Sequence, residues 1–144
     1  MSKINYVDIM FHERKTCLDF VELLLENDWQ YEREGKMTLY LEIEDNHEWI
    51  DMPADREKLI DHIESSKDEN KICGVILYYK DTDIGGDLLI HKGKTISFMA
   101  DINTIYNEDL EGMKIIKADW YLEKLLGPIK GTNIQLLHLE VGQF

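Results

Sequence analysis

The stretch "KMTLYLEIE", residues 36–44, alternates apolar and polar side chains with a period of two. In a β-strand this period places every second side chain on the same face, so that one face is apolar and the other polar. The alternation therefore predicts a half-buried strand. The apolar face carries Met37, Leu39, Leu41 and Ile43, and the polar face carries Thr38, Tyr40, Glu42 and Glu44.

Turn residues on both sides of this strand extend it into a meander. A turn at residues 34–35 separates it from the segment 29–33, and a second turn at residues 45–46 separates it from the segment 47–52. Short polar turns between strand-like segments are typical of antiparallel hairpins. We therefore expect three neighbouring strands in this region.

The rest of the chain predicts further strands and three helices. Apolar residues at helical spacing mark the helices at 16–28, 54–66 and 120–126, and Gly127 is typical of a helix end. Runs of β-branched and apolar residues predict strands at 4–11, 72–79, 87–91, 95–101 and 133–141. The whole predicts one α+β domain over residues 1–144. Its largely antiparallel sheet should have about six to eight strands in two meanders, with about three helices packed on it.

The charge of the chain restricts its partners. The sequence has 29 acidic and 16 basic side chains, which leaves a formal net charge of −13. Such a charge disfavours contact with nucleic acid phosphates and with anionic membranes, and it attracts basic proteins. No segment has the length or apolar content of a signal peptide or a membrane span. We expect a cytoplasmic protein with Cys17 and Cys73 as small core residues.

One segment resembles the end of a phosphate-binding loop. The run Gly93, Lys94, Thr95 matches the last part of the pattern G-x-x-x-x-G-K-[ST], but the position of the first glycine is occupied by Leu88. The loop must also lead into a helix, whereas residues 95–101 predict a strand. The segment therefore predicts a β-hairpin and no nucleotide site.

Other catalytic and metal-binding motifs are missing. Asp81, Asp83 and Asp87 have the alternate spacing of a calcium loop, but Lys92 stands where the closing glutamate is needed. The histidines lack the spacing of a metal-binding helix, and no serine or cysteine has the local sequence of a nucleophile. We predict no cofactor, no metal and no catalytic residue. The many carboxylates leave open a small enzyme whose acid pair has no sequence signature.

Acidic side chains lie beside aromatic ones in the region that predicts the first meander. Aromatic rings supply contact area in protein interfaces, and surrounding carboxylates steer a basic partner toward them. The predicted partner-binding residues are Tyr40, Glu42, Glu44, Asp45, Glu48 and Trp49. A second acidic segment, "YNEDLEGM" at residues 106–113, competes as the contact surface. Its candidate residues are Glu108, Asp109 and Glu111.

The profile of the whole chain resembles the immunity proteins of bacterial toxin systems, including those of contact-dependent growth inhibition. Such proteins are small, acidic and without catalytic machinery, and they neutralise a cognate toxin, usually a basic nuclease. The resemblance implies a basic toxin protein as the partner, and no binding to nucleic acid or membranes. No residue can be assigned from it, since the group shares no diagnostic motif. An acidic DNA mimic that inhibits a host DNA-binding protein has the same profile and remains an alternative.

Overall fold

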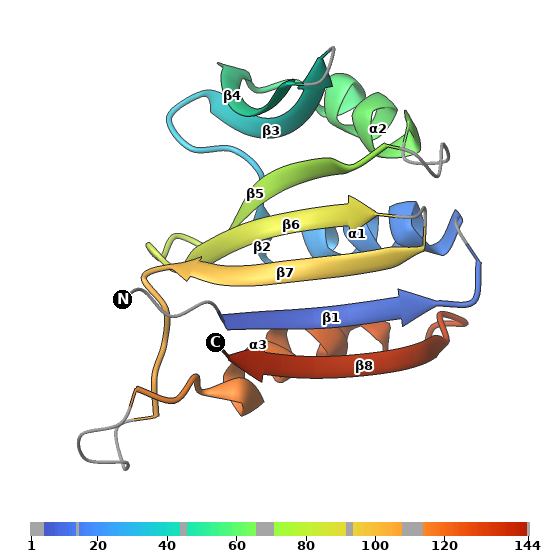
Figure 1. The fold of residues 1–144 in the computed structure, drawn as a ribbon, viewed down its shortest axis with the longest axis vertical. Helices are drawn as coiled ribbons and strands as arrows, with labels where there is room; N and C mark the ends of the chain where they lie inside the picture. Colours follow the sequence, from blue (N-terminus) through green and yellow to red (C-terminus); the bar gives the residue numbers. More distant parts are fainter. Residues whose placement is uncertain are drawn as a thin grey trace.

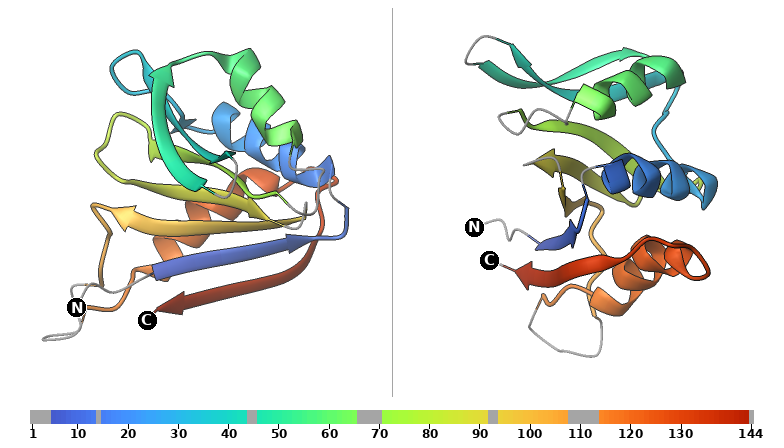
Figure 2. Two further views of the ribbon diagram at one scale, coloured as in Figure 1. Left: turned by 45° about the horizontal axis from the view of Figure 1, so that its top comes forward. Right: turned by 90° about the vertical axis from the view of Figure 1, so that its right-hand side faces the viewer.

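The sheet and its helices form two layers. The computed structural model describes residues 5–13, 15–43, 46–65, 71–91, 94–107 and 114–143. In these residues one open, eight-stranded antiparallel sheet carries all of the α-helices on one face (Figures 1 and 2). No helix in the described part of the chain lies over the other face, which we call the open face. The α+β class with a largely antiparallel sheet is confirmed.

The strands do not follow one another in chain order. From one edge to the other the order is β4 (Asn46–Pro53), β3 (Lys36–Ile43), β5 (Cys73–Tyr79), β6 (Gly85–His91), β7 (Thr95–Ile102), β1 (Asn5–Phe11) and β8 (Leu136–Gln143). The N-terminal strand β1 is therefore inserted between β7 and the C-terminal strand β8 (Figure 1). The β6–β7 hairpin closes through the pair His91 and Thr95. This pairing confirms a hairpin where the phosphate-loop pattern failed.

The segment 29–33 differs from the expected strand. Strand β2 contains only Trp29–Gln30, and it pairs with β5 instead of β3. The chain then turns into β3 at residues 34–35, because the backbone groups of Arg33 and Lys36 hydrogen-bond to each other in an isolated antiparallel bridge. The guanidinium of Arg33 also donates hydrogen bonds to the carbonyl oxygens of Lys80 and Thr82 at 2.7 and 2.8 Å. The three-stranded meander is thus a two-stranded hairpin, β3–β4, with β2 beside it on the edge of β5.

The helices are α1 (Lys15–Glu26), α2 (Arg56–Glu64) and α3 (Ala118–Leu126), and the last continues into a short 3₁₀ turn, η2 (Gly127–Ile129). Helix α2 begins after Asp55, whose side chain accepts a hydrogen bond from the backbone N–H of Lys58, as an N-cap does. Each helix turns its apolar side chains toward the sheet, and the core lies between these layers.

Five aromatic rings form a closed cycle in this core. Each ring centroid lies within 5.0–6.2 Å of the next, and the contacts join α3 to β2, β5 and β7. Indole Nε1 of Trp29 on β2 donates a 2.9 Å hydrogen bond to the carbonyl oxygen of Lys124, near the end of α3. We call this cluster the aromatic cycle. Its members are Trp29, Tyr79, Trp120, Tyr121 and Phe98.

Candidate functional site

The open face displays alternate side chains from seven neighbouring strands of the described sheet. The register of the ladders places side chains of these strands in continuous rows, because opposite residues in antiparallel strands share a face. The middle row joins the two edges of the sheet and ends in acidic residues on β1 and β8. Its members are Trp49, Tyr40, Gly74, Leu89, Ser97, Asp8 and Glu140.

Aromatic and acidic side chains meet at the β3–β4 end of this face. The rings of Tyr40 and Trp49, which are direct cross-strand partners, lie 5.2 Å apart with an interplanar angle of 67°. The ring of His47 stacks on Tyr40 at 6.0 Å with an interplanar angle of 25°. Tyr40 therefore contacts two rings of β4. We call the group of Tyr40, Glu42, His47, Trp49 and Asp51 the β3–β4 patch.

The carboxylates of the β3–β4 patch are held by hydrogen bonds. Oε1 of Glu42 lies 3.4 Å from Nδ1 of His47 and accepts a 3.2 Å hydrogen bond from the backbone N–H of Ile72. Oδ1 of Asp51 accepts a 2.6 Å hydrogen bond from the hydroxyl of Thr38. These bonds fix the charges beside the rings, so a cationic partner would meet a preorganised surface.

The structure brings some of the predicted residues together and separates others. Tyr40, Glu42 and Trp49 lie side by side on the open face, whereas Glu48 faces the opposite side of β4, where it is exposed. The remaining candidates lie outside the described residues. They are Glu44, Asp45, Glu108, Asp109 and Glu111. His47 and Asp51 are not among the predicted partner-binding residues, although their alternation with Trp49 in "HEWIDM" indicates the same strand face.

A pair of aspartates lies near the middle of the open face. Asp87 on β6 and Asp101 on β7 are hydrogen-bonded through their side chains. Partial burial and the hydrogen bond to Asp101 raise the pKa of the Asp87 carboxyl from 3.8 to about 7. The charge of Asp101 also favours the protonated form of Asp87, since two negative charges repel each other at short range. This is the close acid pair whose position the sequence did not reveal.

Replacing Asp87 with asparagine is expected to stabilise the protein at alkaline pH. Since the folded pKa of about 7 exceeds the unfolded value of 3.8, the folded state binds more protons between these values. Stability is therefore lost as pH rises through that interval. Because the side chain is partly exposed, we expect a gain of only about 1 kcal/mol near about pH 8, vanishing near about pH 4.

Thermal unfolding of wild type and variant across this pH range measures the effect. Asp51→Asn on the same face is the matched control, and it should give no gain, because it weakens the hydrogen bond from Thr38. An equal gain for Asp87→Asn at both ends of the pH range would contradict the assigned cause.

A serine and a histidine are also in contact on the open face. Oγ of Ser97 lies 2.8 Å from Nε2 of His91, a distance suited to a nucleophile and its base. However, Ser97 is only 5% exposed, and it lies in a strand paired on both sides. Its neighbouring backbone N–H groups are committed to those ladders and cannot stabilise an oxyanion. The contact is better suited to holding two central strands together.

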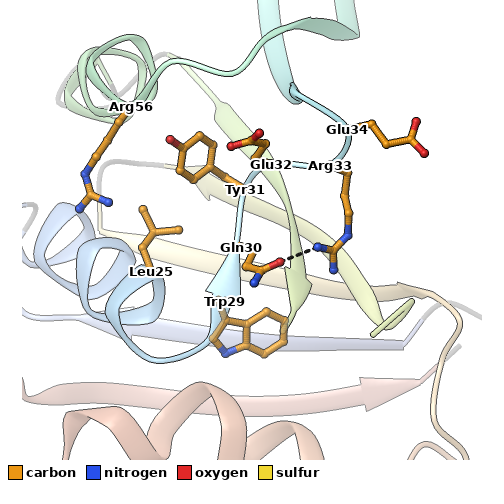
Figure 3. A pocket seen from close by; sticks show the side chains of 8 residues that line it. All are labelled: Leu25, Trp29, Gln30, Tyr31, Glu32, Arg33, Glu34 and Arg56. Atoms are coloured by element: carbon orange, nitrogen blue, oxygen red, sulfur yellow. Dashed lines mark hydrogen bonds between the residues drawn. The ribbon is translucent and has the colours of Figure 1, made fainter. Parts of the chain in front are cut away.

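The cavity in Figure 3 is lined by α1, β2, α2 and the turn that follows β2. Its volume is about 430 Å³, and it is open to solvent between the end of α1, strand β2 and the start of α2. Arg33 at its rim is held by Oε1 of Gln30 and by two backbone carbonyls. Charges of both signs stand around it, with no arrangement for acid–base or nucleophilic chemistry. The lining residues are Leu25, Trp29, Gln30, Tyr31, Glu32, Arg33, Glu34 and Arg56.

Comparisons with family models, with curated proteins and with solved structures found no match. In the part of the chain that the structure describes, no three histidine, cysteine or acidic side chains are grouped so that they could hold a metal ion. No helix among the described residues is long and apolar enough to cross a membrane.

Proposed function

We propose that this chain is an immunity protein that binds a basic toxin, a nuclease, on the open face of its sheet and blocks the toxin's active site or substrate surface. In this role it acts in the cytoplasm of the cell that it protects. The observation that supports the proposal best is the β3–β4 patch, where two contacting aromatic rings and two anchored carboxylates stand on a sheet face without helices.

The aromatic rings would supply the affinity of such a complex. Hot spots of protein interfaces are rich in tryptophan and tyrosine because these rings bury much area at a low cost in conformational entropy. Trp49 and Tyr40 are both partly exposed, and their mutual contact limits their motion before binding. Ordering these two side chains would therefore cost little on association.

The acidic charge would supply speed and selectivity. A net charge of −13 accelerates the encounter with a cationic protein and repels acidic ones. On the open face, Asp8, Asp101 and Glu140 extend the negative charge from the β3–β4 patch to the opposite edge. A nuclease that binds a phosphate backbone presents a complementary cationic surface.

The test begins with the partner. Immobilised protein is incubated with lysate of the native organism, washed at low and then at high salt, and the bound proteins are identified by mass spectrometry. We expect one stoichiometric, basic protein whose nuclease activity is inhibited by the added chain. A host DNA-binding protein in its place would show DNA mimicry, and the recovery of no stable partner would contradict both.

Binding kinetics with the purified partner then test whether the open face is the contact surface. Trp49→Ala should raise Kd by about 30-fold, mainly through faster dissociation. The double variant Glu42→Gln/Asp51→Asn should slow association several-fold at low salt and flatten its salt dependence, since both carboxylates lie in the β3–β4 patch. Glu48→Gln is the matched control: it neutralises an exposed carboxylate of the same strand on the opposite face.

A clear difference between the double variant and its control is the expected result. If Glu48→Gln slowed association by as much per removed charge as the double variant, net charge alone would steer the partner. The assignment of the open face would then be wrong.

A further inference from the structure

The two edges of the sheet are protected to different degrees. Edge strands expose unpaired backbone groups, and proteins block them with prolines or with charges on the apolar side. Strand β4 has both devices, since Glu48 is exposed on the helix side of the sheet and Pro53 ends the strand. Strand β8 has eight residues, "LLHLEVGQ", with no proline, lysine or arginine. The β8 edge is therefore open to pairing.

Apolar side chains are exposed along this open edge. Leu139 lies opposite the fully buried Ile9 on the helix side of the sheet, yet it is 37% exposed. Leu137, at the register shift between β1 and β8, is 52% exposed. These are two of the four large exposed hydrophobic side chains in the described part of the chain. An added strand would cover both.

We propose that a second copy of this chain pairs with β8 in antiparallel orientation, with a twofold axis at Leu139. In this register Leu139 faces its own copy, and Leu137 faces Val141 of the second copy. His138 faces Glu140 of the second copy, and the symmetry repeats this contact. Each chain thus supplies a glutamate opposite the histidine of the other chain.

The side chains of β8 fit a twofold axis at Leu139 and disfavour an axis one residue further along the strand, at Glu140. His138 and Glu140 lie opposite Met10 and Asp8, so both are on the open face and can meet across the axis. Oε2 of Glu140 accepts a hydrogen bond from the hydroxyl of Tyr6 at 3.1 Å, which holds the carboxylate on the open face beside the edge. An axis at Glu140 would instead place two carboxylates face to face, which is unfavourable.

The few charges on β8 permit pairing with a second copy. Two chains of net charge −13 repel each other. In β8, however, one acidic residue is accompanied by one histidine. The β8 edge is therefore a place where two copies meet with little repulsion. Because antiparallel pairing in one sheet keeps each face on the same side, both open faces would point the same way and stay accessible. The inference does not depend on the identity of any toxin.

Sedimentation equilibrium over a range of protein concentrations tests the proposal. We expect wild type to dimerise, and His138→Glu to weaken the dimer by about tenfold, since it creates two Glu–Glu contacts. Glu140→Lys alone should also weaken it. The double variant His138→Glu/Glu140→Lys should restore dimerisation to within about threefold of wild type, because opposite charges face each other again.

Glu48→Lys on the opposite edge is the control and should leave the dimer unchanged. Monomers of wild type at every concentration reached, or a double variant no better than the worse single one, would overturn the proposed pairing. Neither result bears on whether the open face binds a basic protein, which the capture experiment decides separately.

Discussion

Replacing Trp29 with alanine is expected to lower the free energy of unfolding by about 3–5 kcal/mol. The side chain is 1% exposed and contacts the rings of Tyr79 and Phe98. Its removal leaves a large cavity and interrupts the aromatic cycle. It also removes the hydrogen bond to the carbonyl oxygen of Lys124, one of the last carbonyls of α3, which have no partner within the helix.

Chemical denaturation of the purified variant measures this loss, and Trp49→Ala is the matched control. Trp49 is partly exposed on the open face and packs on one side against Tyr40, so we expect its loss to cost no more than about 1.5 kcal/mol. Equal losses for the two tryptophans would contradict the central place given to the aromatic cycle.

Replacing Gly86 with alanine is expected to cost about 2–4 kcal/mol. A Cβ atom at this position would lie 2.1 Å from the carbonyl oxygen of Met99 and 2.7 Å from Cζ of Phe98. The first of these atoms belongs to the backbone of β7 and cannot rotate away. The two central strands would have to separate at the register shift between Gly85 and Asp87.

Gly127→Ala is the control for this variant. Gly127 has a right-handed helical backbone, with φ of −51°, and an added Cβ would meet no atom within 4 Å apart from those of its chain neighbours. Alanine restricts the unfolded chain, whereas the ring of Pro128 disfavours a helical backbone at the preceding residue, so we expect a change of no more than about 1 kcal/mol in either direction. A variant Gly86→Ala as stable as Gly127→Ala would show that β6 and β7 are packed less closely than the approach of Met99 and Phe98 to Gly86 indicates.

Single helices and strands of this fold could be predicted because each has a pattern within its own short segment of sequence. The alternation in residues 36–44 identified β3, and apolar residues at helical spacing identified all three helices. The position of β1 between β7 and β8 in the sheet could not be predicted. Its pairing with β8 joins residues more than a hundred positions apart, for instance Tyr6 with Gly142, and no short pattern encodes such a choice.

The candidate site was predicted only where its residues share one strand pair. Tyr40 and Trp49 come together as expected, but Glu48 was grouped with them because it is their neighbour in sequence. The strand period of two sends it to the other face. The contact between Asp87 and Asp101 depends on the register shift next to Asp87, where one strand has gained a residue over the other. Such a shift cannot be located from composition or spacing.

The aromatic cycle should make two of the three tryptophans of the protein spectroscopically different from the third. Trp29 and Trp120 belong to the cycle, in fixed tilted contact with neighbouring rings, so they should dominate the near-ultraviolet circular dichroism and lose it when packing is lost. Trp49 stands apart on the open face beside Tyr40. The variant Trp49→Phe identifies the part of the tryptophan fluorescence that comes from Trp49. A change in fluorescence without a change in near-ultraviolet dichroism would then indicate binding or rearrangement at the open face. A change in both would indicate that the aromatic cycle has lost its packing.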